Sequence, residues 1–480
     1  MKKTAIGRRT FMKAMGLGAA ALAAPRAMLG AKPPAGKPNV IIIFADDQGY
    51  QDMGCFGSPK ITTPNFDRMA AEGMKFTDFY SAASVCSPSR AALLTGCYPP
   101  RVSLTNVLFP RNKNGLNPKE ITIADMLKAC GYATACVGKW HLGHLKPFLP
   151  TSQGFDSYFG IPYSNDMTID PKAPLADDIT LRQGVTPADM KSPKPKRNWV
   201  PLMRDEKVVE YPADQSTLTR RYTEESIRFI TANKDRPFFL YLPHTLPHVP
   251  LFASKAFKGK SARGLYGDTI EEIDWGLGQI IATLKRLGID GKTLIVYTSD
   301  NGPWLSKGKA GGCALPLRGG KFQTYEGGMR EPTLMRWPGK IPAGKVCKEV
   351  AGTIDLLPTL ASLAGAKVPG DRVIDGKDIW PLMSGQAQAV SPHEYYYYYR
   401  GNRLEAVRSG KWKLRLAGQR RRKQPADPQP VRGELYDLRA DISEKKNLIA
   451  KHPDVAKRLA AALAAFDKEL KANRRPAGKV

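Results

Sequence analysis

Four short, continuous apolar segments along the chain are each followed by polar residues. They lie at 40–44, 132–137, 238–242 and 293–297. Because their apolar residues do not alternate with polar ones, they are typical of strands buried on both faces, as in a mainly parallel sheet covered by helices. Helical patterns lie between them, at 123–129, 218–232 and 270–287. This alternation of strands and helices predicts an α/β layered fold.

Residues capable of chemistry follow each of these predicted strands. In chain order they are Asp46 and Asp47, Lys139 and His141, His248, and Asp300 and Asn301. Ligands of open α/β sheets bind at the carboxyl ends of the strands. One such polar cluster is typical of a loop, whereas four in equivalent positions predict a single site.

The segment 86–96 reads CSPSRAALLTG and predicts a cysteine at the start of a helix. Pro88 suits the first helical position, and the unpaired N–H groups there, together with Arg90, favour binding of an anion. The alternative for Cys86 is a buried structural cysteine.

The pattern changes after residue 390. Short antiparallel strands are predicted at 394–399, 403–407, 411–416 and 433–438, followed by an amphipathic helix at 453–472. We therefore expect a main domain over 38–389 and a smaller C-terminal subdomain over 390–480. The segment 167–216 has little periodicity, which predicts a long surface loop of the kind that selects substrates.

Residues 1–31 are interpreted as an export signal. Arg8 and Arg9 begin a twin-arginine pattern, and a run of small apolar residues follows at 14–24. This run is too short to cross a bilayer, which takes about 20 apolar residues. We expect export through the twin-arginine translocon to the periplasm or beyond, without a stable membrane anchor.

The chain is also strongly basic. Its 480 residues carry a formal net charge of +29, and such a surface attracts polyanions. No nucleic-acid-binding motif is present, so we expect no nucleic acid partner, whereas a sulfated polysaccharide fits the charge. The basic run at 403–423 is interpreted as a solvated face, with contact to an anionic polymer as the alternative. Seven scattered cysteines match no zinc pattern, and neither disulfide pairing nor oligomeric state is predicted.

Six blocks of sequence together resemble the type I, formylglycine-dependent sulfatase family. They lie at 45–47, 86–96, 138–143, 160–166, 299–303 and 320–332. The resemblance covers 39–448 and is strongest to the arylsulfatase A and N-acetylgalactosamine-6-sulfatase branch. It implies an alkaline-phosphatase-like fold, with a large, mixed, mainly parallel sheet between helices and a smaller C-terminal antiparallel sheet.

The resemblance also implies two cofactors. A maturation enzyme would oxidise Cys86 to formylglycine (3-oxoalanine), and calcium would be bound by Asp46, Asp47, Asp300 and Asn301, with residue 86 supplying a further oxygen. The residue types agree, because carboxylate and amide oxygens form a hard ligand set that suits Ca²⁺, or less well Mg²⁺, rather than zinc.

Catalytic roles follow from the same resemblance. Arg90 would hold the hydrated aldehyde, while Lys139 and Lys321 would bind the sulfate oxygens as charge redistributes in the transition state. His248, together with Lys321, would protonate the departing alcohol, and His141 would deprotonate the second hydroxyl so that sulfate leaves. Ser164 would contact the bound sulfate. Glu326 and Arg330 are expected to form a structural ion pair beneath Lys321.

The sequence thus predicts an exported sulfuric ester hydrolase acting on a sulfated carbohydrate or an aryl sulfate. One alternative is a phosphonate or phosphate monoester hydrolase, although an alkaline-phosphatase site would have a Ser or Thr nucleophile and more His and Asp metal ligands, in contrast to the thiol at position 86 and the single-metal ligand set. The other is a non-catalytic paralogue that binds polyanions, which would leave Cys86 unmodified.

Overall fold

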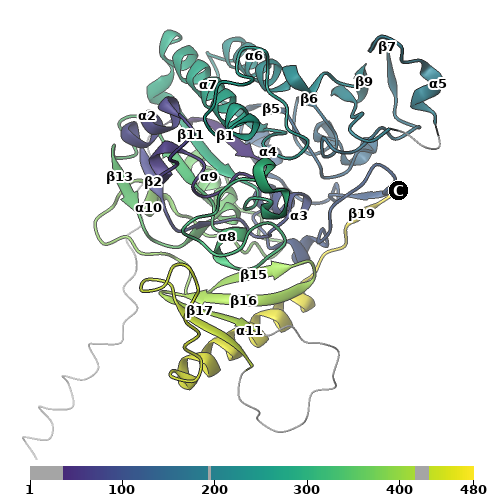
Figure 1. The fold of residues 1–480 in the computed structure, drawn as a ribbon. Helices are drawn as coiled ribbons and strands as arrows, with labels where there is room; N and C mark the ends of the chain where they lie inside the picture. Colours follow the sequence, from purple (N-terminus) through teal and green to yellow (C-terminus); the bar gives the residue numbers. More distant parts are fainter. Residues whose placement is uncertain (1–35, 193–195, 417–431) are drawn as a thin grey trace, which may run out of the picture. The chain divides into compact units, whose positions relative to one another are not determined.

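A large mixed sheet forms the centre of the computed structural model, which describes residues 36–192, 196–416 and 432–480. Within these ranges its eleven strands lie in the order β13-β2-β12-β11-β1-β10-β5-β6-β8-β9-β7 (Figure 1). In that order their bounds are Lys345–Cys347, Met74–Phe76, Thr333–Arg336, Thr293–Ser299, Asn39–Ala45, Phe238–Pro243, Ala133–Val137, Ser157–Gly160, Leu202–Arg204, Lys207–Tyr211 and Leu175–Leu181.

The middle of this sheet is parallel. β11, β1, β10, β5 and β6 all run the same way, and they include the four apolar segments that the sequence pattern predicts as buried strands. In the register, Phe44 pairs with Pro243 and Ala45 pairs with Ser299, so the carboxyl ends of three strands lie level. The polar residues that follow these strands therefore meet at one edge of the sheet.

Helices cover both faces of the sheet. α6 (Leu218–Ala232) and α7 (Leu265–Arg286) lie on one side, with α3 (Cys86–Thr95), α4 (Ile123–Ala129) and α9 (Leu356–Ala364) on the other (Figure 1). The described ranges also contain the helices α2 (Pro64–Glu72), α5 (Pro187–Met190), α8 (Glu326–Met329) and α10 (Trp380–Met383). One core cluster joins Ile41 and Ile43 of β1 to residues of α2, α6 and α7. The predicted α/β fold is confirmed.

The segment 167–216 differs from the loop that the sequence predicts. It contains β7, β8 and β9, which extend the central sheet beyond β6. β7 has exposed and half-buried residues throughout, so its sequence shows no apolar stripe. This strand forms through backbone pairing with β9, and such pairing leaves no periodic pattern in the sequence.

A second, antiparallel sheet stands near the C-terminus. It consists of β15 (Tyr396–Arg400), β16 (Arg403–Ser409), β17 (Trp412–Leu416) and β18 (Gly433–Asp437). The amphipathic helix α11 (Pro453–Ala472) packs against it through its apolar side chains (Figure 1). The small pairs β3–β14 (Phe79–Tyr80 with Ala351–Gly352) and β4–β19 (Asn114–Gly115 with Gly478–Lys479) complete the strands of the described ranges.

A buried cluster of charges joins the two sheets. We call Asp78, Glu326, Glu444, Arg330, Arg408 and Lys413 the junction cluster. Lys413 of β17 donates to Glu326 at 2.8 Å, and Arg330 lies 3.3 Å from the same carboxylate. Arg408 of β16 lies 2.6 Å from Asp78. The interpretation of 403–423 as a solvated face is therefore wrong for Arg408 and Lys413, because both are buried against carboxylates; residues 417–423 of that run lie outside the described residues.

The export signal predicted for residues 1–31 also lies outside the described residues. Among the residues that the structure describes, no helix combines the length and the apolar composition that crossing a membrane requires.

Candidate active site

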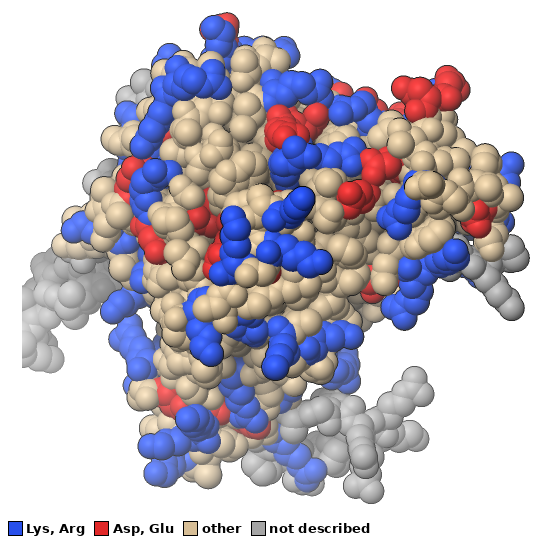
Figure 2. Space-filling model, turned by 45° about the horizontal axis from the view of Figure 1, so that its top comes forward, with Lys and Arg blue, Asp and Glu red and all other residues tan. Residues whose placement is uncertain are grey.

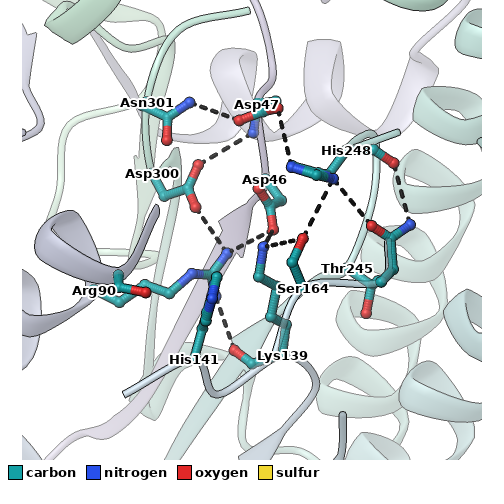
Figure 3. Close-up of polar contacts among 12 residues, drawn as sticks. Asp46, Asp47, Arg90, Lys139, His141, Ser164, Thr245, His248, Asp300 and Asn301 are labelled. Atoms are coloured by element: carbon teal, nitrogen blue, oxygen red, sulfur yellow. Dashed lines mark hydrogen bonds and ion pairs between the residues drawn. The ribbon is translucent and has the colours of Figure 1, made fainter. Parts of the chain in front are cut away.

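Most of the residues that the sequence singles out meet at the carboxyl edge of the central sheet (Figure 3). Asp46 and Asp47 follow β1, Lys139 and His141 follow β5, His248 follows β10, and Asp300 and Asn301 follow β11. Cys86 and Arg90 come from the first turns of α3, Ser164 follows β6, and Lys321 lies in the loop before α8. All are buried.

Glycines let these strand ends approach one another. Gly138, directly before Lys139, has φ of +135°, and a Cβ there would lie 1.9 Å from the carbonyl oxygen of Pro243. Gly160 at the end of β6 is equally tight, since its Cβ would lie 1.8 Å from the carbonyl oxygen of Gly138. Any larger residue would push Lys139 away from the site.

Three carboxylates meet three cations at this edge. We call Asp46, Asp47, Asp300, Arg90, Lys139 and Lys321 the strand-end cluster. Lys321 Nζ lies 2.7 Å from Asp47, and Lys139 Nζ pairs with Asp46. The ammonium of Lys139 also lies 3.2 Å from Ser164 Oγ. The two lysines and Ser164 therefore present hydrogen-bond donors to the same small region.

The sequence pattern suggests that Arg90 faces an external anion, but in this structure it pairs with carboxylates of the protein itself. Its guanidinium lies 3.1 Å from Asp46 and 2.8 Å from Asp300, and it donates to the carbonyl of Lys139 at 2.8 Å. The helix α3 also begins at Cys86, two residues before the predicted start at Pro88. Arg90 therefore holds two strand ends together.

Two oxygens of the site are left without partners in the described part of the chain. Asn301 Nδ2 donates to Asp47 and to the carbonyl of Gly302, which fixes the amide and leaves its Oδ1 buried with no hydrogen bond. Asp46 Oδ1 is likewise buried and unpartnered. Unsatisfied buried acceptors are costly, so their presence here points to a cation.

The pKa values of two of the three carboxylates support the same conclusion; although burial raises it, Lys139 and Arg90 hold the pKa of the third, Asp46, well below its usual range. Burial and the nearby Asp46 raise the pKa of Asp300 to about 7. Burial raises the pKa of Asp47 as well, although Lys321 opposes it. A raised pKa means that the positive charge around a buried carboxylate is too small to stabilise its ionised form. A divalent cation would supply the missing charge. The ligand atoms of Asp46, Asp47 and His248 all lie within 4.8 Å of one another, a group that does not include Asp300.

His248 has a defined tautomer. Its Nδ1 faces the carbonyl oxygen of Val249 at 2.6 Å and Asn165 Oδ1 at 3.0 Å, so Nδ1 carries the hydrogen. Its Nε2 lies 3.7 Å from Asp47. Burial and Lys321 hold the pKa of His248 well below its usual value.

Asn165 is a site residue that sequence reasoning did not single out. Its Nδ2 donates to the carbonyls of Pro250 and His248, which turns Oδ1 towards the imidazole. Its place in the block 160–166 that carries the family resemblance is the signal that would have found it.

His141 presents the opposite nitrogen. Its Nε2 lies 2.8 Å from the carbonyl oxygen of Leu108, so Nε2 donates and Nδ1 keeps its lone pair. Nδ1 is buried and has no hydrogen-bond partner among the described residues. Burial, with Lys139 and Arg90, holds the pKa of His141 well below its usual value, so the ring is neutral at pH 7.

Two of these residues have strained backbones. His141 has φ of +60° and Asp47 has φ of +64°, the left-handed region that non-glycine residues rarely occupy. Such strain costs about 1–3 kcal/mol per residue and clusters at functional sites.

Cys86 is only 2% exposed. Burial raises the pKa of its thiol, although Lys139 and Lys321 oppose the shift. A thiol held in its protonated form is a weak nucleophile, because the thiolate is the reactive species. Unmodified Cys86 is therefore poorly suited to attack a substrate.

Comparison with known proteins identifies the family. Residues 38–366 match the family model described as Sulfatase, and residues 320–469 match the model described as N-sulphoglucosamine sulphohydrolase, C-terminal. This chain belongs to the sulfatase family. It is a sulfuric ester hydrolase, as the sequence predicts.

Individual relatives extend over most of the sulfatase chain. Arylsulfatase A of Homo sapiens is 40% identical over 440 residues, which are 86% of this chain and 83% of the human protein. N-acetylgalactosamine-6-sulfatase of Mus musculus is 41% identical over 403 residues, 79% of this chain and 72% of the mouse protein. The crystal structure of Ps i-CgsB in complex with k-i-k-neocarrahexaose matches with a TM-score of 0.76 at 32% identity, covering 90% of this chain and 93% of that one.

Proposed function

We propose that this sulfatase removes sulfate from a carbohydrate, using a formylglycine made from Cys86 and a calcium ion held at the strand-end cluster. The convergence at one sheet edge of Cys86, two lysines and buried oxygens that have no partner among the described residues carries this proposal. A carbohydrate polyanion fits the surface, because Lys and Arg side chains outnumber Asp and Glu on the face in Figure 2. Ps i-CgsB, whose crystal holds a neocarrahexaose, supports a carbohydrate substrate by analogy.

Asp46, Asp47, Asp300 and Asn301 would hold the calcium. When bound, the ion would polarise a sulfate oxygen, and formylglycine would supply the oxygen nucleophile that a protonated thiol cannot. All four ligands offer oxygen, and two of the oxygens have no other partner among the described residues, which suits a hard cation.

Lys139, Lys321 and Ser164 would bind the sulfate group. Lys139 Nζ lies 3.2 Å from Ser164 Oγ, and Lys321 Nζ lies 2.7 Å from Asp47. Their fixed donors would stabilise the charge that develops on the sulfate oxygens as the S–O bond breaks.

The two histidines would move protons in opposite directions. His248 Nε2 would donate to the departing alcohol oxygen, and the negative charge of a bound sulfate ester favours the imidazolium that this step requires. His141 Nδ1, a buried lone pair without a partner in the described ranges, would accept a proton when sulfate is released.

Mass spectrometry tests the modification directly. The tryptic peptide 76–90 contains Cys86, and the next peptide, 91–101, contains Cys97 as an internal control. In active protein from its native host, we expect the first peptide to have lost sulfur and two hydrogens and gained one oxygen, while Cys97 remains a thiol. Fully active protein with an intact thiol at position 86 would refute the proposal.

Export through the twin-arginine route is the second part of the proposal. Arg8 and Arg9 followed by the apolar run at 14–24 support it. Replacing both arginines by lysine should leave the protein in the cytoplasm, and cell fractionation followed by a sulfatase assay measures this. Undiminished export of the double variant would contradict it.

A further inference from the structure

Two aromatic side chains stand beside the candidate site. Trp304 follows the β11 loop that contains Asp300 and Asn301, and Phe322 directly follows Lys321. Their ring centroids lie 5.5 Å apart with planes at 81°, an edge-to-face pair. We call these two residues the aromatic wall.

The aromatic wall lies beside His248 and Lys321, the residues proposed to act on the leaving alcohol. The rings of Trp304 and His248 lie 5.7 Å apart. Lys321 Nζ lies 4.6 Å from the Trp304 ring and 5.5 Å from the Phe322 ring. A group attached to an oxygen that His248 protonates therefore extends towards this wall.

The wall is also accessible and held in place. Phe322 is 43% exposed, although its neighbour Lys321 is buried. Its backbone has φ of +70°, a strained value for an aromatic residue, and its N–H donates to the Ser84 carbonyl at 2.9 Å. Neither the exposure nor the strain stabilises the fold, which points to a role in binding.

Lys307 completes the edge of the wall. Its Nζ lies 4.3 Å from the Trp304 ring, and its side chain forms no ion pair within the described ranges. It can therefore donate to hydroxyl or acidic groups of a ligand that packs on the wall. Such a mixture of aromatic surface and polar donors suits a sugar ring, which has both C–H and hydroxyl faces.

We propose that the aromatic wall is the binding site for the sugar ring of the departing alcohol, an inference that rests on the proposed sulfatase mechanism. With the leaving oxygen about 3 Å from His248, the attached sugar ring would reach Trp304, whose ring lies 5.7 Å from the imidazole, and Phe322 packs against Trp304. The wall therefore selects the leaving group, whereas Lys139, Lys321 and Ser164 select the sulfate.

The test compares Trp304→Ala and Phe322→Ala with Leu305→Ala, a neighbouring residue that is 48% exposed and lies outside the wall. We expect both wall variants to raise KM for a panel of monosulfated hexoses by about tenfold or more, with kcat little changed. Inhibition by inorganic sulfate, which has no leaving group, should be unaltered, and Leu305→Ala should match the wild type. Unchanged KM values, or parallel weakening of sulfate inhibition, would overturn the proposal.

A binding measurement tests the sugar-binding role of the aromatic wall independently of the proposed catalytic mechanism. Calorimetry of the same sulfated hexoses with Cys86→Ala protein in calcium buffer needs no turnover. Adding Trp304→Ala should weaken binding of the hexose sulfates but not of inorganic sulfate, even if the wild type proves inactive as a sulfatase. If instead only an aryl sulfate loses affinity, the assignment of the wall to a sugar ring is wrong.

Discussion

The strand-end cluster and the junction cluster contain the same charges, three carboxylates and three cations, and both are buried. They differ in how completely their oxygens are paired. At the junction, Glu326 accepts from Tyr80 and Tyr398 and also contacts Arg330 and Lys413, so both oxygens are satisfied. At the strand ends, Asp46 Oδ1 has no partner among the described residues. Glu444 Oε1 at the junction also accepts no hydrogen bond among the described residues, but Lys413 Nζ lies 2.9 Å from it. Oxygens paired in this way hold elements together, whereas an unpaired oxygen such as Asp46 Oδ1 is suited to a ligand.

The pKa values of one carboxylate from each cluster, Glu326 and Asp300, show this contrast, although Asp46 has a lowered pKa and Glu444 a raised one. Burial raises the pKa of Glu326, but the opposing effect of Lys413, Arg330 and Arg408 is larger. The pKa of Glu326 is therefore well below its usual range. Burial raises the pKa of Asp300 to about 7, and Arg90 only partly opposes this. Ion pairing therefore stabilises the ionised form of Glu326. The ionised form of Asp300 would need more positive charge nearby than Arg90 provides.

The largest expected effect concerns the chemistry of the strand ends. Cys86→Ala should lower kcat by at least about 10³-fold, because it removes the proposed precursor of the nucleophile. Sulfate release from a chromogenic aryl sulfate measures this, and thermal unfolding checks that the fold is kept. Cys97→Ala, which removes another buried thiol just beyond the end of the same helix, serves as the control and should stay active. Substantial activity in Cys86→Ala would mean that another residue attacks sulfur.

The next prediction removes a charge from the junction instead. Glu326→Gln should lower the free energy of unfolding by about 3 kcal/mol, because Lys413 and Arg330 would each lose one of the two buried carboxylate partners they have among the described residues, keeping only Glu444 and Asp78. Denaturant unfolding measures the loss. Glu224→Gln is the matched control: it belongs to an exposed pair with Arg220 at 3.4 Å and should cost at most about 0.5 kcal/mol. Equal effects of the two variants would show that the junction cluster does not stabilise the fold.

Calcium removal distinguishes the clusters most directly. A ligand at 100 times its Kd stabilises the folded state by about 2.7 kcal/mol, so chelation should lower the unfolding temperature of the wild type. Asp300→Asn should abolish this calcium-dependent shift, whereas Glu326→Gln should keep it on a lower baseline. Differential scanning calorimetry with and without chelator gives the comparison. A full shift in Asp300→Asn would exclude the strand ends as the calcium site.

The smallest effect is a pH dependence at the junction. The folded pKa of Glu326 is lowered from its usual 4.5, so its contribution to stability is present above that pH and is lost as pH falls through the folded value. The difference in unfolding free energy between the wild type and Glu326→Gln should therefore shrink as pH falls below about 4.5. Urea unfolding over this pH range measures it, and a constant difference would contradict the lowered pKa.

Much of the fold could be predicted from local patterns. The strands β1, β5, β10 and β11 and the helices α4, α6 and α11 lie where apolar runs and amphipathic periodicity indicate them. β7 could not be predicted in this way, because its residues are polar and its order comes from pairing with β9. Tyr396 to Tyr399 form a buried strand, as their β-propensity suggests.

The sequence by itself determined which chemical groups this sulfatase has and that they follow parallel strands, because apolar runs and short motifs are local properties of the chain. Only the tertiary structure decided their partners. That Arg90 is bound by Asp46 and Asp300, that His141 and His248 expose opposite nitrogens, and that Lys413 is buried against Glu326 all depend on contacts between distant segments. Charge and hydrogen bonding act through space, so the pairing that separates the candidate active site from a structural cluster exists only in the folded chain.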